Sequence, residues 1–158
     1  MKSVPDFCDE YWDKIQILQL NFKNFGAVHA FCGEIVTVEC PEDNSFVRQL
    51  LKVDGTRKVL VVDGGASNSC AYLGDNLGVL ACDNNWEGIL INGMVRDVDE
   101  LANIQIGIKA LGVHPKKSEK RGLGEFGHDI EFGGVKFQSG AFVYCDNNGV
   151  IVSSSQLS

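Results

Sequence analysis

The sequence has no apolar run that approaches the roughly 20 residues needed to span a membrane as a helix. Residues 1–16 carry acids and aromatic side chains throughout, so no basic segment followed by an apolar one predicts a secretory signal. None of the six cysteines forms a Cys-x-x-Cys pair, and no histidine lies at zinc-ligand spacing from any two of them. These absences exclude a membrane protein and a zinc module, and they predict a reducing compartment, the cytoplasm.

Positive charge is also scarce, since 14 Lys and Arg stand against 21 Asp and Glu and leave a formal net charge of −7. Nucleic-acid binding requires a basic face that neutralises phosphates, so direct binding to nucleic acid is not expected. The one basic cluster, Lys116-Lys117 with Lys120-Arg121, is interpreted as a solvated loop. The acidic exterior favours a basic partner instead, including the RNA-binding region of another protein.

Motifs for nucleophilic catalysis and nucleotide binding are missing as well. The three histidines have no Ser or Cys beside them in a nucleophile-elbow setting, which argues against a triad hydrolase. Gly64-Gly65 fits neither G-x-G-x-x-G nor G-x-x-x-x-G-K-[ST], so we interpret it as a tight turn and not as a nucleotide loop. Every lysine except Lys109 and Lys136 lies in a polar stretch, which disfavours a Schiff-base lysine because such a lysine needs burial.

What remains is a chain of 158 residues with 44% apolar residues, typical of one globular domain over residues 1–158. Apolar periodicity predicts helices over 9–18, 46–53 and 75–82, a short helix after Asp97, and strands over 35–40, 58–62, 88–92 and within 106–113. Short strands follow over 130–132, 135–137, 142–145 and 150–152. We therefore expect an α/β domain with a helical N-terminal half and a strand-rich C-terminal third. In the first helix the side chains expected to face the core are those of Tyr11, Trp12, Ile15 and Leu18.

Two separate motifs carry the chemistry: Gly74-Asp75-Asn76-Leu77 and Arg96-Asp97. The first lies where a loop enters a predicted helix, whose free N–H groups bind carboxylate or phosphate oxygens. The second follows the strand-like run 88–93 and thus stands at a strand's C-terminal end, where sites of α/β folds tend to lie. An arginine, an amide cradle and two carboxylates indicate a small 2-oxo acid substrate with Mg²⁺ or Mn²⁺.

Simpler interpretations exist for the acids. Asp97 is a preferred residue for capping the next helix, and Arg96 can pair with an acid at the surface. Asp146 either adds a second acid to the site, within the chain or across a subunit interface, or closes a hairpin as an Asx turn, which is the favoured interpretation. Asp63 is a weaker candidate for lining the site from behind.

Further segments, in an order that spans most of the chain, match a known pattern. They are Phe31-Cys32-Gly33-Glu34-Ile35-Val36-Thr37-Val38, Glu42-Asp43-Asn44, Val59-Leu60-Val61-Val62-Asp63-Gly64-Gly65, Asn85-Trp86-Glu87-Gly88, Gly93-Met94-Val95-Arg96-Asp97-Val98-Asp99-Glu100 and Ala141-Phe142-Val143-Tyr144-Cys145-Asp146-Asn147-Asn148-Gly149-Val150. Together these segments resemble the regulator of ribonuclease activity A family. The chain is similar in particular to its metal-dependent 4-hydroxy-4-methyl-2-oxoglutarate aldolases, the class II pyruvate aldolases of this fold.

The resemblance implies a swivelling β/β/α sandwich assembled as a homotrimer, and a lyase that releases pyruvate from 4-hydroxy-4-methyl-2-oxoglutarate or decarboxylates oxaloacetate. The resemblance implies that Arg96 binds the substrate carboxylate. Gly74 and the N–H groups of Asn76 and Leu77 are then expected to hold substrate oxygens from the opposite side. Asp97 is the metal ligand, for Mg²⁺ or Mn²⁺, and Asp75 orients a metal-bound water that moves a proton.

The same resemblance implies an alternative, because family members that regulate a ribonuclease share nearly the same fold and length. Those regulators often lack the acid after the arginine, whereas Arg96-Asp97 is intact here beside Asp75. Larger aldolase members carry a C-terminal extension that brings an acid to a neighbouring subunit, and a chain ending at Ser158 is expected to lack it. Some relatives are labelled methyltransferases of quinone synthesis, but the sequence offers no convincing loop for S-adenosylmethionine.

Overall fold

The computed structural model describes all 158 residues, and its centre is a set of four parallel strands, β3, β4, β6 and β7. They run in the order β3-β4-β6-β7 and are joined through short helices, as parallel strands require. The strands of the chain are β1 (Ile15–Ile17), β2 (Lys23–Asn24), β3 (Phe31–Glu39), β4 (Lys58–Asp63), β5 (Ala71–Leu73), β6 (Gly88–Val95), β7 (Gly107–Val113), β8 (Glu125–Phe126), β9 (Ile130–Phe132), β10 (Val135–Phe137), β11 (Phe142–Asp146) and β12 (Gly149–Ser153). The helices are α1 (Val4–Tyr11), α2 (Ser45–Leu51), α3 (Asp75–Asp83) and α4 (Val98–Leu101).

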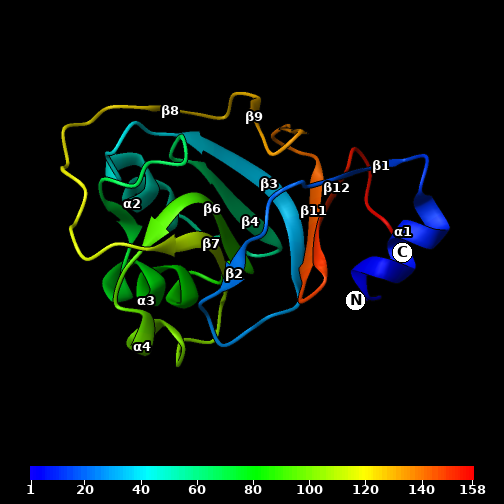
Figure 1. Ribbon diagram of the computed structural model, residues 1–158, viewed down its shortest axis with the longest axis horizontal. Helices are drawn as coiled ribbons and strands as arrows, with labels where there is room; N and C mark the ends of the chain where they lie inside the picture. Colours follow the sequence, from blue (N-terminus) through cyan, green and yellow to red (C-terminus); the bar gives the residue numbers. More distant parts are fainter.

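Antiparallel strands extend this sheet at both edges, so the full order is β1-β12-β11-β3-β4-β6-β7-β2 (Figure 1). Two short strands pair beside that path, β5 parallel to β6 and β8 antiparallel to β3. The hairpin β9–β10 forms a separate two-stranded sheet. The result is a mixed sheet with few helices, which confirms the predicted α/β class.

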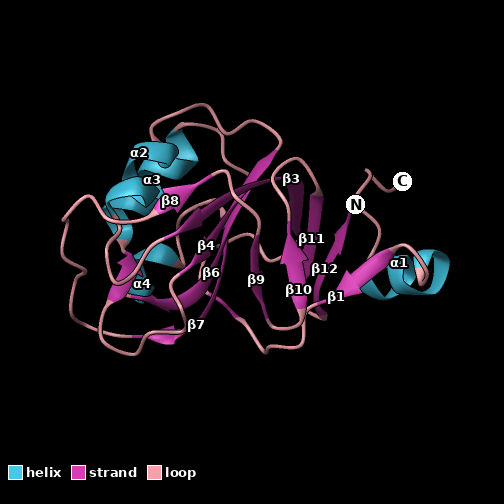
Figure 2. Cartoon of the chain, turned by 90° about the horizontal axis from the view of Figure 1, so that it is seen from above, coloured by secondary structure: helices cyan, strands magenta, loops and turns pink.

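Alternate residues of the central strands supply two different cores, as the period of a strand dictates. In β4, Leu60 and Val62 join the side chains of α2, α3 and α4, whereas Val59 and Val61 join those of β9, β10, β11 and β12. Figure 2 shows the three helices on one side of the central sheet and the β9–β10 hairpin on the other. This layering of strands, sheet and helices agrees with the expected β/β/α arrangement.

The N-terminal region differs from its prediction. The helix runs over Val4–Tyr11 and not over 9–18, because Ser3 caps it and Pro5 occupies its first turn. The prediction followed the apolar spacing of later residues and missed this start signal. The predicted core residue Trp12 is 77% exposed, and Ile15 lies in β1, while Leu18 is buried as expected. The N-terminal half is also rich in strands, since β1 to β5 all precede α3.

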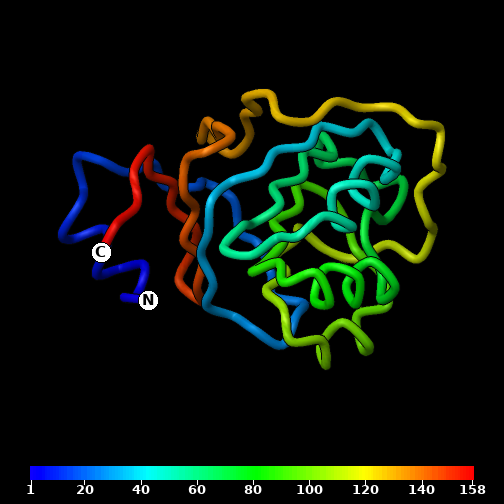
Figure 3. Tube along the Cα trace, turned by 180° about the vertical axis from the view of Figure 1, so that it is seen from behind, coloured from blue at the N-terminus to red at the C-terminus, as the bar shows by residue number.

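The two chain ends lie together beside α1 (Figure 3), where Lys2 Nζ donates to the Ser158 backbone oxygen at 3.0 Å. Of the predicted strands, β3 and β6 run longer than expected, and the two-residue strands β2 and β8 and the three-residue β5 were missed. The helices over 46–53 and 75–82 are confirmed to within two residues. No helix is both long and apolar enough to cross a membrane.

Candidate functional site

The two predicted motifs meet at the carboxyl end of β6. Arg96 and Asp97 follow its last residue directly, and Gly74 follows the last residue of the neighbouring strand β5. The Arg96 N–H donates to the Leu73 oxygen at 2.9 Å, which fixes the two strand ends side by side. Asp75 then begins α3, so the start of that helix faces the Arg96-Asp97 turn. The six predicted site residues all line one hollow of about 100 Å³; their roles remain predictions.

Asp97 has a left-handed backbone, with φ 56° and ψ 42°, a conformation that Asp tolerates better than most residues. This bend places the Asp97 Oδ2 at 3.0 Å from the Asp75 N–H, from which it accepts a hydrogen bond. A Cβ at position 74 would stand 2.4 Å from the same oxygen, so only glycine leaves room for the carboxylate there. Gly74 therefore has a steric role beside the predicted one of presenting backbone to an anion.

The interpretation of Asp97 as a side-chain cap of the following helix is wrong. Asp97 occupies the position before α4, but its side chain makes no hydrogen bond to that helix and reaches the first residue of α3 instead. Asp99 and Glu100 are exposed at the start of α4, where negative charge suits the helix dipole.

Four basic side chains line the hollow together with the two acids: Arg48, Arg96, Lys117 and Lys120. The guanidinium of Arg96 donates to the Pro115 oxygen at 3.4 Å, and Lys120 Nζ donates to Asn44 Oδ1 at 3.0 Å. With four cations against two carboxylates, the hollow suits a small anion. We call it the basic hollow. The predicted solvated loop thus contributes two lysines to the site, a placement that depends on the long-range pairing of Lys117 with Ala71 and has no local sequence signal.

The loop that carries these lysines is anchored by Asp43, to which the sequence analysis gave no role at the site. Its carboxylate accepts hydrogen bonds from the Arg121 N–H at 2.6 Å, from the Leu123 N–H at 3.0 Å, and from the N–H and hydroxyl of Ser45. Burial would raise the pKa of Asp43, but these hydrogen bonds outweigh it and lower the pKa to about 2. One sequence signal could have pointed to Asp43. It is an acid just before α2, and because Asn44 already occupies the N-cap position of that helix, the Asp43 carboxylate is left for another partner.

One of the amides expected to hold substrate is engaged in this structure. The Asn76 N–H donates to Asp75 Oδ1 at 2.8 Å, so the Asp75 carboxylate folds over the helix start. An anion that takes this amide must displace the Asp75 carboxylate from it. Asn76 is exposed and Leu77 is buried.

The donor set of the hollow fits a hard divalent cation that keeps most of its own shell. No group of three or more His, Cys, Asp or Glu side chains in the chain is arranged to hold a metal. Asp97 supplies one carboxylate, and its Oδ1 is free of protein hydrogen-bond donors while its Oδ2 is held by the Asp75 N–H. Mg²⁺ is commonly bound through one or two carboxylates with water and substrate oxygens completing its octahedron.

The other candidate acids lie elsewhere. Asp146 closes the β11–β12 hairpin, its Oδ1 accepting from the Asn148 N–H at 2.7 Å, so the Asx-turn interpretation is confirmed. Asp63 accepts from the Gly65 N–H and from Asn92 Nδ2, and it lines a different hollow beyond β3 and β4. The Gly64-Gly65 turn packs on Tyr72, whose ring a Cβ at position 64 would meet at 2.5 Å.

That second hollow, of about 630 Å³, lies at the carboxyl ends of β3 and β4, and we call it the acidic hollow. Its charged lining side chains are Glu39, Glu42, Asp63 and Glu125. Glu42 Oε1 accepts from Ser67 Oγ, a hydrogen bond that lowers the Glu42 pKa. Glu39 and Glu125 stand directly opposite each other in the antiparallel β3–β8 pair.

No cysteine is arranged as a nucleophile. All six are free, and burial raises the pKa of Cys40 to about 12. Burial also raises the pKa of Cys8, Cys32, Cys70 and Cys145. A reactive thiolate needs the opposite environment, so these side chains pack as small hydrophobes.

Comparison with known proteins gives one consistent family. A family model described as "RraA-like: Aldolase/RraA" matches residues 4–152. Proteins from Pseudomonas fluorescens (strain Pf0-1) and Hahella chejuensis (strain KCTC 2396), both named "putative 4-hydroxy-4-methyl-2-oxoglutarate aldolase", are 51% and 53% identical to the chain. These alignments cover 98% and 100% of this chain, and 94% and 97% of the two relatives.

Two solved structures share nearly the whole fold. The RNA-processing inhibitor RraA from Thermus thermophilis superposes with a TM-score of 0.96 at 37% identity, over 100% of this chain and 96% of the other. A structure from Geobacillus kaustophilus HTA426, named S-adenosylmethionine: 2-dimethylmenaquinone methyltransferase, has a TM-score of 0.97 at 40% identity, over 99% and 97% of the two chains. The same fold thus carries three different functional names.

Proposed function

Because the chain belongs to the RraA-like family of aldolases and RraA proteins, we propose that it is a divalent-metal-dependent lyase. Its proposed reactions are cleavage of 4-hydroxy-4-methyl-2-oxoglutarate to pyruvate and decarboxylation of oxaloacetate. The observation that carries the proposal is the meeting of Arg96 and Asp97 with the start of α3 in the basic hollow. Relatives more than half identical over nearly their full length bear the aldolase name, which supports it further.

Substrate binding follows from the charges of the hollow. Both substrates are dicarboxylates with a 2-oxo group. The planar Arg96 guanidinium matches the carboxylate beside the oxo group with two parallel hydrogen bonds. Lys117 and Lys120, on the opposite loop, lie where the second carboxylate can meet positive charge. Two anchors at the ends of the substrate fix the carbon–carbon bond between them.

Both reactions break a carbon–carbon bond and leave the electron pair on C3 as the enolate of pyruvate. In the aldol cleavage Asp75 takes the proton of the 4-hydroxyl group, directly or through a water, and the C3–C4 bond breaks to give the second pyruvate. In the decarboxylation the same electron pair is left when carbon dioxide departs. Protonation of C3 completes each reaction, so one site serves both.

Asp97 would hold the divalent cation, Mg²⁺ or Mn²⁺. When bound there, the cation supplies an electrophile that polarises the 2-oxo group and disperses the negative charge of the enolate. The left-handed turn at Asp97 and the Asp75 N–H keep the carboxylate directed into the hollow before substrate arrives. We also propose a homotrimer with each site near a subunit boundary, on the family resemblance alone.

A second function is favoured by the structure of the RNA-processing inhibitor RraA, which the chain matches over 100% of its own length and 96% of the other. The acidic hollow and the net charge of −7 suit a basic segment of a partner such as a ribonuclease. A methyltransferase is not favoured, because the Gly65 N–H at the glycine turn is engaged by Asp63 and Tyr72 fills the space beneath Gly64.

The proposal is tested by measuring pyruvate release from each substrate, with and without Mg²⁺ or Mn²⁺. Metal-dependent release that falls in Arg96→Ala and persists in Asp99→Asn, an exposed acid on α4, supports the lyase. In parallel, inhibition of a ribonuclease is measured at low and high salt. Absence of release by the wild type, with salt-sensitive inhibition that Arg96→Ala leaves unchanged, refutes the lyase and establishes the regulator.

A further inference from the structure

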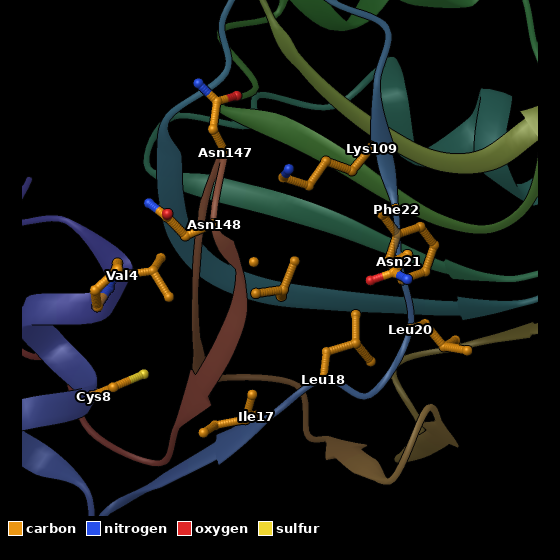
Figure 4. Close-up of a pocket in the computed structure, with 13 residues that line it drawn as sticks. Val4, Cys8, Ile17, Leu18, Leu20, Asn21, Phe22, Lys109, Asn147 and Asn148 are labelled. Carbon is orange, nitrogen blue, oxygen red and sulfur yellow. The ribbon is translucent and has the colours of Figure 1, made fainter.

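A separate pocket of about 260 Å³ lies between α1, the segment before β2, and the β11–β12 turn (Figure 4). It shares no lining residue with the basic hollow. Apolar side chains that include Leu18, Leu20 and Phe22 form one wall, and Lys109, Asn147 and Asn148 form a polar end. The pocket is therefore amphipathic.

Lys109 is the unusual member of this set. It lies within β7, opposite Asn24 of β2, and only 3% of it is exposed. Its neighbours Ile108 and Ala110 join the core beneath the helices, so Lys109 points to the other face of the sheet. Figure 4 shows its ammonium directed toward Asn147 and Asn148.

No protein group neutralises this ammonium by direct contact. Lys109 takes part in none of the ion pairs of the chain, and its Nζ has no hydrogen-bond acceptor. Asp146 is the acid whose charge acts on it, but that carboxylate already accepts from the Val4 N–H at 2.8 Å, from the Asn148 N–H at 2.7 Å and from Asn148 Nδ2 at 3.3 Å. Burial accordingly lowers the pKa of Lys109, despite the opposite effects of Cys145 and Asp146.

A second polar atom beside the lysine is also unsatisfied. Asn24 donates from its Nδ2 to Asn147 Oδ1 at 2.8 Å, while its own Oδ1 is buried without a partner. The Lys109 side chain lines the pocket with no acid in contact, and the Asn24 Oδ1 is buried without a donor. An anion with an apolar body would give the ammonium a partner and fill the pocket.

We propose that this pocket binds a small organic carboxylate, with the carboxylate group on the Lys109 ammonium and the side-chain amide of Asn147. The apolar body of the ligand packs against Leu20 and Phe22. One cation with amide donors matches a singly charged carboxylate better than a phosphate, which would need more donors than the polar end offers. The site goes beyond the proposed lyase and is open to an effector that is not turned over.

Benzoate is the probe, with benzamide as its uncharged counterpart, and binding is measured by calorimetry and ligand-observed NMR. The measurements use the Arg96→Ala protein, since benzoate can also bind in the basic hollow. We expect Arg96→Ala to bind benzoate and not benzamide. Adding Lys109→Met, which keeps the length of the side chain and removes its charge, should weaken benzoate binding by about tenfold or more.

Three results overturn the proposal. The first is that Arg96→Ala does not bind benzoate at any concentration up to its solubility limit. The second is equal binding with and without Lys109→Met. The third is benzamide binding as tightly as benzoate, which would assign the affinity to the apolar wall.

A second variant decides the matter if Lys109→Met does not fold. Leu20→Trp, also in the Arg96→Ala protein, fills the apolar end and should abolish benzoate binding, whereas Val53→Trp at an exposed site should leave it intact. Retained binding in Leu20→Trp overturns the proposed location.

Discussion

The carboxyl ends of β4 and β6 lie side by side in the central sheet, with Asp63 paired to Asn92, yet they carry opposite charges. The end of β6 opens onto the basic hollow, and the end of β4 onto the acidic hollow. The parallel sheet supplies the same geometry to both, so the difference comes from the loops that cover them. One edge of one fold thus carries a basic hollow, which we propose binds the substrate, and an acidic hollow, which we propose for a basic partner.

A single loop contributes to both hollows. Lys117 and Lys120 belong to the basic hollow, and Leu123 and Glu125, a few residues later, belong to the acidic hollow. Asp43 holds the part between them through the Arg121 and Leu123 N–H groups. We therefore expect changes at Arg96 and Asp97 to affect lyase activity alone and changes at Glu125 to affect partner binding alone. Changes at Asp43 should affect both.

The largest effect is expected from Asp97→Asn. Asparagine tolerates the left-handed backbone and keeps an oxygen for the Asp75 N–H, but it removes the charge that would hold the cation. We expect metal-dependent pyruvate release to fall on the order of 10²–10³-fold, with melting within a few degrees of the wild type. Near wild-type release with added Mg²⁺ would refute the metal role of Asp97, and Asp99→Asn is the matched control.

Arg96→Lys should have the next largest effect on catalysis. Lysine keeps the positive charge and loses the planar fork, so the carboxylate is attracted but no longer oriented. We expect kcat/KM for oxaloacetate to fall about 10- to 100-fold, with both a higher KM and a lower kcat, and further in Arg96→Ala. Steady-state kinetics separate the two parameters. A change in KM alone would show that Arg96 binds without orienting.

Asp43→Asn is expected to damage both hollows at once. Its carboxylate accepts four hydrogen bonds, and the amide cannot accept them all, so the loop should loosen. Since the folded pKa of about 2 lies below the ordinary 3.8, the Asp43 charge stabilises the fold above pH 3.8, and this stability is lost as pH falls toward 2. We expect a loss of about 2 kcal/mol, or about 4–8 °C in melting temperature, at neutral pH.

The measurement for Asp43 is thermal melting of wild type and variant at several pH values, together with KM for oxaloacetate. The difference in melting temperature should shrink between pH 4 and pH 2. A constant difference across that range would show that the side chain acts by its shape and not by its charge.

Much of this edge of the sheet was predictable from the sequence. The Val-, Ile- and Leu-rich runs around 58–62 and 88–92 identified buried strands, and the residues that follow such strands stand at a site-bearing edge. Arg96 and Asp75 were therefore placed correctly relative to strand and helix. The family resemblance supplied the roles, which spacing alone did not give.

The parts of the site that the sequence did not predict depend on long-range contacts. The sequence around Lys117 and Lys120 is polar and has no period, and only the pairing of this loop with Ala71 brings it to the hollow. The bond from the Asp75 N–H to Asp97 joins two segments that local propensity treats as separate. The helix predicted over 9–18 was wrong because a local pattern was misleading. Tyr11, Trp12, Ile15 and Leu18 have helical spacing, but Ile15 packs inward from strand β1 and Leu18 from the segment after it.

The smallest effect is expected in the acidic hollow, from Glu125→Gln. Glu125 stands directly opposite Glu39 in the β3–β8 pair, and like charges in that position repel, while its exposed contact with His128 adds little. Removing the charge should therefore raise stability slightly, by about 0.5 kcal/mol. Glu131→Gln is the matched control, since Glu131 stands opposite Lys136 and its loss should not stabilise the protein.

The same variant tests what the acidic hollow does. If it receives a basic segment of a ribonuclease, Glu125→Gln should weaken that binding severalfold at low salt and reduce its salt dependence, because exposed charges are screened within about 8 Å at physiological ionic strength. Pyruvate release should remain at the wild-type rate, since Glu125 does not line the basic hollow. Binding measured by calorimetry at two salt concentrations gives the slope for each variant. If the salt dependence of binding is unchanged in Glu125→Gln and reduced in Arg96→Ala, the partner binds at the basic hollow. That result would refute the assignment of substrate and partner to two separate hollows.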